Sequence, residues 1–207
     1  LGASFRSKLV EHGHPVTCFG LHRPPIAADF RTANLEVVAT DAFNEAEDGK
    51  RGPVDVLINN AGMTRINFIP FHMLKDFEEV MRVNLTAPFV LCKEFVRRIY
   101  TYPAVGRTYR IVNTSSMGAR FALRASPAYC ASKAGLEHMT RSIAKEQAGK
   151  TPLMACCIAP NGIEGTPMTE YVTRRTYETR GWSKEQAEKY NVNNPLGRLQ
   201  TFEELWC

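Results

Sequence analysis

The sequence has no long hydrophobic run, no concentrated charge and no cysteine or histidine spacing typical of a metal site. No stretch reaches the roughly 18 apolar residues of a membrane-spanning helix, so we expect no membrane partner. The 26 basic and 21 acidic residues leave a net charge of +5. Because this charge is spread along the chain, it argues against a protein that binds nucleic acid. We interpret this surplus as solvated surface; attraction of an anionic small molecule or acidic carrier is the alternative. The six cysteines are predicted to be reduced, because 207 residues can bury a core without disulfides.

Short apolar segments alternate with helical ones along the chain. Residues 14–19, 35–40, 54–59, 109–114 and 153–159 are typical of strands covered on both faces. Long helices are predicted over residues 73–100 and 126–149. The alternation predicts an α/β fold over residues 1–207 as a single domain, a doubly wound parallel sheet with helices on both faces.

The two ends of the sequence predict a fold that lacks elements at its start and at its end. Residues 2–13 form an amphipathic segment ending at Gly13, but no strand precedes it, as a helix of a parallel sheet requires. Residues 202–205 are typical of a helix start. We therefore expect the first strand and a C-terminal strand to be absent. A sheet with such a gap would leave backbone groups unpaired, so we expect residues 1–207 alone to be unstable.

Tyr129 and Lys133 carry the strongest chemical signal. Positions four apart on a helix share a face, so the phenol and the ammonium project the same way. A nearby cation lowers a tyrosine pKa from about 10. Tyr129 could then exchange a proton near neutral pH. Alone, this spacing is common on helix surfaces.

Ser115 and Ser116 follow the strand predicted over 109–114, at the sheet edge where ligands of open α/β folds bind. Ser116 precedes Tyr129 by 13 residues, which lets the chain turn back and bring the two hydroxyls together. A serine pair after a strand is otherwise a turn or a helix cap. Together, the two motifs predict an active site that uses Ser116.

Asn84 lies within the helix predicted over 73–100, where asparagine is a poor helix former. Pro88, four residues later, has no N–H to donate to the Asn84 carbonyl, so a kink is expected. A kink that the helix merely tolerates is the alternative interpretation.

These motifs together resemble the short-chain dehydrogenase/reductase family, a Rossmann-like fold of enzymes that bind NAD or NADP. The resemblance covers the chain from residue 1 to residues 195–198 and rests on Asn59, Asn60, Ala61, Gly62, Asn84, Ser116, Tyr129 and Lys133. It implies that Ser116 holds the substrate oxygen and that Tyr129 exchanges the proton. It also implies that Lys133 binds the nicotinamide ribose and lowers the tyrosine pKa, and that the Asn84 carbonyl holds a water of the proton relay.

The resemblance also implies cofactor contacts. They fall on Gly2 of the phosphate loop, Asp41 at the adenine, Asn59, Ala61 and Gly62 near the adenosine ribose, Tyr129 and Lys133, and Ile163 and Thr166 near the carboxamide. Asn161 and Gly165 depart from the family pattern beside Ile163. Gly20 occupies the position of the acidic residue that selects NAD, and Arg23 could bind a 2′-phosphate. NADP is therefore the expected cofactor. In the alternative interpretation, the cofactor is NAD and Arg23 is an ordinary surface residue.

Residues 59–67 resemble the N-N-A-G-x-T-R-x-N stretch of 3-oxoacyl-carrier-protein and acetoacetyl-CoA reductases. The implied reaction is reduction of a 3-oxoacyl thioester on CoA or acyl-carrier protein, as in fatty acid biosynthesis, by a homodimer or homotetramer in the cytoplasm or an organelle matrix. Residues 168–194 are predicted to form a mobile helical lid, whose aromatic side chains pack the lid or contact substrate. The alternatives are a sugar, polyol or other secondary-alcohol dehydrogenase, and a cofactor-binding regulator without turnover.

Overall fold

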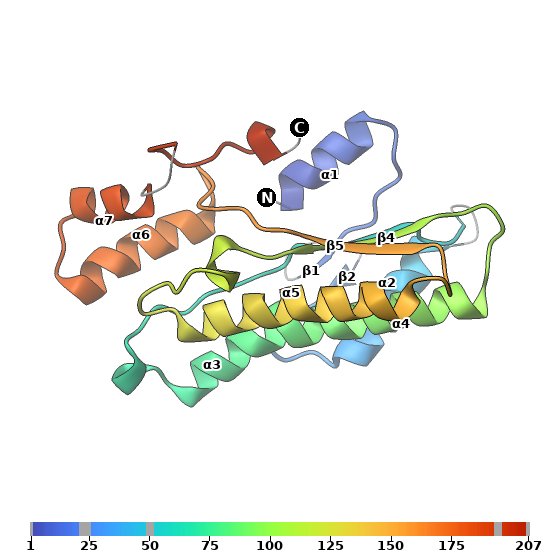
Figure 1. Cartoon of the computed structure of the whole chain (residues 1–207), viewed down its shortest axis with the longest axis horizontal. Coiled ribbons are helices and arrows are strands. Elements are labelled where there is room, and N and C mark those ends of the chain that lie inside the picture. The colour runs from blue at the N-terminus through green and yellow to red at the C-terminus, as the bar shows by residue number, and fades with distance from the viewer. Residues whose placement is uncertain (1, 21–25, 49–51, 193–195, 206–207) are drawn as a thin grey trace.

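Parallel strands organise the fold in the computed structural model, which describes residues 2–20, 26–48, 52–192 and 196–205 (Figure 1). Strands β1 (Phe19–Gly20) and β2 (Ile26–Ala27) pair with each other. Strands β3 (Val56–Asn59), β4 (Tyr109–Thr114) and β5 (Leu153–Ile158) form a second parallel sheet in the order β3-β4-β5. The predicted α/β class with parallel strands is confirmed.

Helices lie on both sides of the strands. In Figure 1, α1 (Gly2–Glu11) is above them, and α2 (Leu35–Ala46), α4 (Ala87–Thr101) and α5 (Pro127–Gln147) are below. The main core lies between the sheet and these lower helices, where Phe95, Tyr109 and Ile111 are almost fully buried. In the described part of the chain, no helix has the length and apolarity needed to cross a bilayer.

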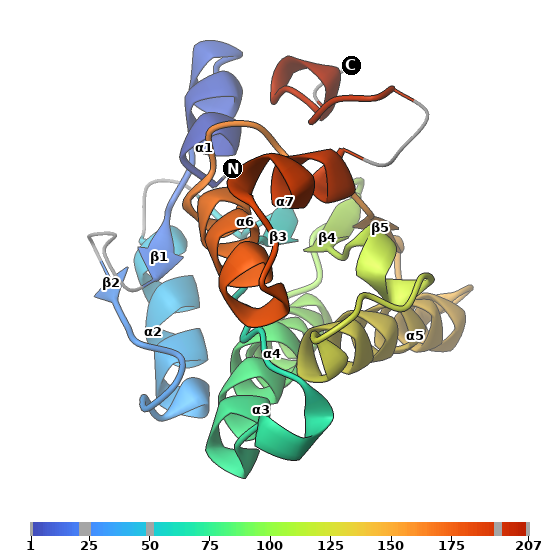
Figure 2. The ribbon, with the colours of Figure 1, turned by 90° about the vertical axis from the view of Figure 1, so that its left-hand side faces the viewer.

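A second group of helices lies beyond the carboxyl ends of the strands. Helices α6 (Pro167–Arg180) and α7 (Lys184–Asn191) form a hairpin there, close to the start of α5 (Figure 2). The helical character predicted for residues 168–194 is thus confirmed for the described residues. The remaining short segments are η1 (Ile69–Phe71), η3 (Met117–Ala119) and η4 (Glu203–Leu205).

Helix α3 (Leu74–Met81) continues into α4 through a π-helical turn, η2 (Arg82–Thr86). The Ala87 N–H bonds to the Arg82 carbonyl, five residues back, and Pro88 follows in the first turn of α4. The helix predicted over 73–100 is confirmed, and the irregularity expected near Asn84 takes the form of a π-bulge, a feature frequent at functional sites.

The strand predicted over residues 35–40 is wrong, because this segment begins helix α2. The Asn34 side chain accepts hydrogen bonds from the backbone N–H groups of Glu36 at 3.1 Å and Val37 at 3.4 Å, which caps the helix. The buried residues recur at helical spacing: Leu35, Ala39, Ala42 and Phe43. The actual strand, β2, lies earlier and is only two residues long.

Asn34→Ala is expected to lower the free energy of unfolding by about 1 kcal/mol, because two N–H groups at the start of α2 lose their acceptor. Asn34→Asp keeps an acceptor oxygen, so its free energy of unfolding should stay close to that of the wild type. Urea titration of the three proteins measures the difference. Equal stability of Asn34→Ala and the wild type would contradict the capping role.

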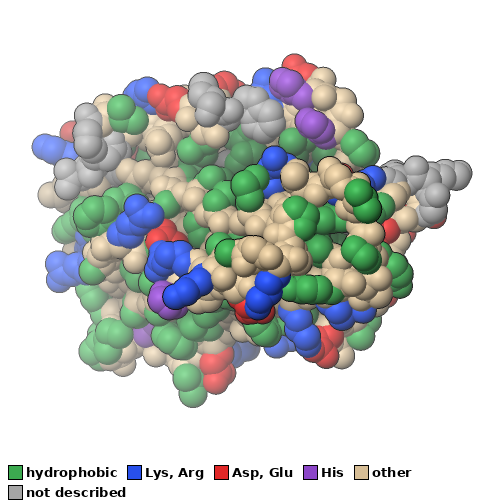
Figure 3. All heavy atoms as spheres, turned by 45° about the vertical axis from the view of Figure 1, so that its right-hand side comes forward, with side chains coloured by type: hydrophobic (Ala, Val, Ile, Leu, Met, Phe, Trp, Pro, Cys, Tyr) green, Lys and Arg blue, Asp and Glu red, His purple; other side chains and the backbone are tan. Residues whose placement is uncertain are grey.

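The charged side chains are dispersed over the surface. Figure 3 shows Lys and Arg side chains at several separate places on one face, with acidic and apolar side chains between them. Most of the described arginines pair with a carboxylate, as Arg65 does with Glu79 at 3.0 Å. The face in view therefore shows no continuous basic surface of the kind typical of nucleic-acid binding.

Candidate active site

The carboxyl end of β4 leads into two buried serines with different partners. The Ser116 hydroxyl accepts the Gly118 N–H at 3.1 Å, which fixes it at the start of η3, and it hydrogen bonds with the Tyr129 phenol. Ser115 turns the other way and donates to the buried Glu137 carboxylate at 3.0 Å. Ser116 is therefore the serine that lies beside the tyrosine.

Tyr129 lies in the first turn of α5, and its ring packs against the loop after β4. A Cβ built on Gly118 would lie 3.4 Å from the Tyr129 ring. Burial raises the pKa of Tyr129, and the hydrogen bond with Ser116 offsets only part of this effect. The expected lowering of the tyrosine pKa is thus wrong for this structure: the phenol is protonated at neutral pH.

Lys133 lies on the same face of α5, four residues after Tyr129. Its side chain is almost fully buried, and Nζ lies 5.8 Å from the centre of the Tyr129 ring. Nζ donates to the Thr114 carbonyl at 2.7 Å. Burial lowers the pKa of Lys133 to about 8, so the ammonium titrates near physiological pH.

Asn84 anchors the segment after β3 through its side chain. Its Nδ2 donates to the Met63 carbonyl at 2.9 Å and to the Ser132 hydroxyl at 3.0 Å, and its Oδ1 accepts the Met63 N–H at 2.9 Å. The side chain is fully buried in the π-bulge. Sequence reasoning assigned a role only to the main-chain carbonyl of Asn84 and missed this contribution.

Gly62 brings the backbone close to both groups. A Cβ at this position would lie 3.4 Å from Lys133 Nζ and 3.6 Å from Asn84 Oδ1. The preceding residue, Ala61, is exposed. The structure therefore brings Ser116, Tyr129 and Lys133 to one place, with Gly62 and Asn84 beside them.

Other residues expected to contact a cofactor lie at the same end of the sheet. Gly2 begins α1, and a Cβ there would lie 2.9 Å from Asn60 Nδ2, so the N-terminus of this helix lies against the segment after β3. The Asn59 side chain is buried and donates to Asn113 Oδ1 at 2.8 Å, so it supports β4 rather than facing outward. A helix N-terminus offers N–H groups that suit a phosphate.

Ile163 and Thr166 lie together at the start of α6. The Ile163 carbonyl accepts hydrogen bonds from the hydroxyls of Thr166 at 3.2 Å and Thr169 at 2.7 Å. Thr166 also caps α6 by accepting the Thr169 N–H. A carboxamide that used the Ile163 carbonyl would therefore compete with bonds inside the protein.

The position expected for Asp41 is wrong. Asp41 lies within α2 and is exposed, not after a strand. The acidic residue that follows a strand is Asp29, after β2, where it pairs with Arg31 at 2.6 Å. Sequence reasoning missed Asp29 because the apolar run before it, Ile26 to Ala28, is very short. Arg23 lies outside the described residues.

Comparisons of sequence identify relatives. Residues 25–176 match the family model described as short chain dehydrogenase. A 3-oxoacyl-[acyl-carrier-protein] reductase from Aquifex aeolicus is 36% identical over 152 residues, 73% of this chain and 55% of that protein. A 2-dehydro-3-deoxy-D-gluconate 5-dehydrogenase from Formosa agariphila is 30% identical over 150 residues, 68% of this chain and 54% of that protein. The chain thus spans about half the length of these relatives.

Solved structures share the fold. A protein from Agrobacterium tumefaciens with bound NADP, provisionally described as a 2-deoxy-D-gluconate 3-dehydrogenase, superposes with a TM-score of 0.70 at 28% identity. The match covers 87% of this chain and 64% of that one. A short chain dehydrogenase family protein from Francisella tularensis has a TM-score of 0.80 at 20% identity, covering 99% and 82% of the two chains.

Proposed function

The chain belongs to the short-chain dehydrogenase family, and from this we propose that it is an NAD(P)-dependent oxidoreductase that reduces a ketone, in the first instance a 3-oxoacyl thioester. One observation carries the proposal. The Ser116 hydroxyl, the Tyr129 phenol and the Lys133 ammonium converge at the carboxyl end of β4, held by hydrogen bonds to Gly118 and Thr114. Open α/β sheets bind their ligands at this edge.

The residues at this edge fit a dinucleotide. The glycine at position 62 leaves room beside Lys133 Nζ and Asn84 Oδ1 that any side chain would fill. Lys133 would hold the nicotinamide ribose, and the N-terminus of α1 at Gly2 would hold phosphate oxygens. When bound, the nicotinamide supplies the hydride. The NADP-bound relative supports NADP, as does Gly20, which offers no carboxylate against a 2′-phosphate.

The side chains supply proton transfer and orientation. One lone pair of the Ser116 hydroxyl accepts the Gly118 N–H, and its single proton can turn from the Tyr129 oxygen to the substrate carbonyl oxygen when substrate binds. Tyr129, protonated at neutral pH, donates its proton to the same oxygen as that oxygen becomes an alkoxide. Asn84 keeps residue 63 and α5 in fixed positions around the site. The raised tyrosine pKa keeps the phenol in its proton-donating form at neutral pH.

Two substrate classes have support. Residues 59–67 and the relative from Aquifex aeolicus favour a 3-oxoacyl thioester, on CoA or acyl-carrier protein. The relative from Formosa agariphila favours a sugar acid or polyol as the second candidate. The presence of both Tyr129 and Lys133 argues against a regulator without turnover.

Kinetics with NADPH decide between these candidates. We expect acetoacetyl-CoA to be reduced with a larger kcat/KM than any sugar or polyol oxidised with NADP⁺. Turnover of polyols alone would select the second candidate, and no turnover of either class would overturn the proposal.

Ser116→Ala is expected to lower kcat by about 10²-fold, because the carbonyl oxygen loses a positioned donor.

A further inference from the structure

Arg124 lies in the loop that packs on the tyrosine. The neighbouring Leu123 lies against Gly118, where a Cβ would meet Leu123 Cδ1 at 2.9 Å and the Tyr129 ring at 3.4 Å. Ala125 has a left-handed backbone conformation, with a φ of 63°, which turns the chain between Arg124 and α5. The Arg124 guanidinium lies over the Phe68 ring, 5.4 Å from its centre. Arg124 is thus held on the rim of the candidate active site.

Arg180 brings a second positive charge to the same loop. It is the last residue of α6, and its guanidinium lies 4.5 Å from the Trp182 ring centre and 4.4 Å from the Tyr190 ring centre. The two rings contact each other edge to face. One nitrogen of Arg180 donates to the Arg124 backbone carbonyl at 3.4 Å. The hairpin α6–α7 therefore presents a fixed guanidinium beside the backbone of the loop that carries Arg124.

Neither guanidinium has an acidic partner among the residues that the structure describes. The nearest acidic residue of α6 in sequence, Glu178, pairs with Arg174 and Arg175 instead. Aromatic rings hold a guanidinium in place but leave its charge largely uncompensated. An anion beside either guanidinium would accept charge-assisted hydrogen bonds that no carboxylate of the described residues accepts. A planar guanidinium binds phosphate and carboxylate through paired N–H groups.

We propose that Arg124 and Arg180 bind a phosphate or carboxylate group that the substrate carries away from its reacting carbon. The inference rests on the proposed function and adds a substrate class to it: the enzyme prefers anionic carbonyl or alcohol compounds to neutral ones of the same reacting group.

Two pairs of substrates test the proposal. Acetoacetyl-CoA and the neutral N-acetylcysteamine thioester of acetoacetate share the reacting group, and gluconate and sorbitol form the carboxylate pair. In the wild type, the anionic member of at least one pair should have the larger kcat/KM. Arg124→Gln and Arg180→Gln should each reduce that preference by about tenfold, mainly through KM. The neutral member should keep its kcat/KM in both variants.

Arg174→Gln is the matched control, because it removes a charge from the same helix where a carboxylate is already 4.0 Å away. A preference for acetoacetyl-CoA alone assigns the site to phosphate, and a preference for gluconate alone assigns it to carboxylate. Equal use of charged and neutral members, or an equal loss in Arg174→Gln, overturns the inference while the oxidoreductase remains.

A binding measurement separates failure of the inference from failure of the function. If no compound is turned over, the proposed function fails, and calorimetric titration of acetoacetyl-CoA and gluconate still tests the rim. Affinity about tenfold weaker in Arg124→Gln and Arg180→Gln for either compound supports the anion site. Unchanged affinity for both compounds overturns it.

Discussion

Tyr129→Phe is expected to lower kcat by about 10³-fold while the dissociation constant for NADPH stays within about twofold of the wild type. The substitution removes only the phenolic oxygen. The ring that packs against Gly118 and lies near Lys133 is retained, so the site keeps its shape. NADPH oxidation measures the first quantity, and fluorescence titration of NADPH measures the second.

Tyr102→Phe is the matched control for this prediction. Tyr102 is exposed after the end of α4, where loss of the same atom should leave kcat unchanged. Because burial raises the Tyr129 pKa, the phenol stays protonated through neutral pH, so a fall in kcat/KM near pH 8 should report loss of the Lys133 charge, and a further fall at more alkaline pH should report loss of the phenolic proton. Undiminished turnover in Tyr129→Phe would mean that another group supplies the proton.

Lys133→Met is expected to combine a loss of activity with a gain in stability. Methionine fits the buried stem but lacks the charge that would hold a ribose, so we expect kcat/KM to fall by about 10²-fold or more. Burial of the ammonium with one carbonyl partner is what lowers its pKa from 10.5 to about 8. That shift corresponds to about 3 kcal/mol against the folded state when the lysine is charged.

The gain in stability should depend on pH. Below pH 8 the lysine is charged in both states, and the folded state bears the full cost of burial. Between pH 8 and 10.5 the unfolded chain binds more protons, so the wild type gains stability as pH rises. The free energy of unfolding of Lys133→Met should therefore exceed that of the wild type most at pH 7. The expected difference there is about 2 kcal/mol, once the loss of the hydrogen bond to Thr114 is subtracted. Above pH 8 the difference should shrink.

Urea titrations from pH 7 to pH 10 measure this difference, with Lys145→Met as the control. Lys145 is exposed near the end of α5, and its removal should give the wild-type pH dependence. A constant offset between Lys133→Met and the wild type across this range would show that Lys133 does not titrate within it.

Sequence reasoning identified the helices that carry the site, because the length and the apolar spacing of these segments are typical of helices and not of strands. It failed at the start of the sheet, where β1 and β2 have two residues each and give no periodic signal. The apolar run Leu35 to Thr40 has the composition of a strand, but the cap at Asn34 and a buried face at helical spacing decide for a helix. The displaced strand also led to the choice of Asp41, whereas the acidic residue that follows β2 is Asp29.

At the candidate active site, sequence reasoning could not predict burial or contacts between distant segments. Spacing on one helix brought Tyr129 and Lys133 together correctly, but the sign of the tyrosine pKa shift depends on burial, which spacing does not measure. The side-chain bonds of Asn84 join segments far apart in the chain, residue 63 and residue 132, so no local pattern could indicate them. Arg124 and Arg180 likewise meet only through the fold.

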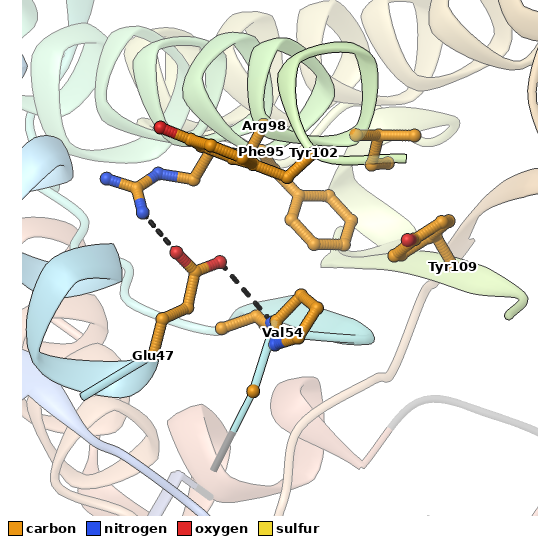
Figure 4. Close-up of a pocket in the computed structure, with 9 residues that line it drawn as sticks. Glu47, Val54, Phe95, Arg98, Tyr102 and Tyr109 are labelled. Atoms are coloured by element: carbon orange, nitrogen blue, oxygen red, sulfur yellow. Dashed lines mark hydrogen bonds and ion pairs between the residues drawn. The ribbon is translucent and has the colours of Figure 1, made fainter. Parts of the chain in front are cut away.

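A cavity at the end of the sheet opposite the site is lined partly by side chains of the core, such as Phe95 and Ile99, and partly by residues outside it, such as Tyr102. It has a volume of about 270 Å³ and lies at the amino ends of β3 and β4, with Val54, Phe95 and Tyr109 in its wall (Figure 4). An ion pair between Arg98 and Glu47 closes one side. The Tyr109 hydroxyl, buried here, has no hydrogen-bond partner in the described part of the chain.

The π-helical turn between α3 and α4 lets the long helix hold one residue more than a regular α-helix of the same course. Because the wide turn absorbs that residue, α3 and α4 keep the rotational phase of one continuous helix, and Val80 stays fully buried. Deletion of one residue from Arg82–Thr86 would close the turn into regular α-helix and leave Val80 in the core. The displaced group would instead be the Asn84 side chain, which the wide turn holds against Met63 and Ser132.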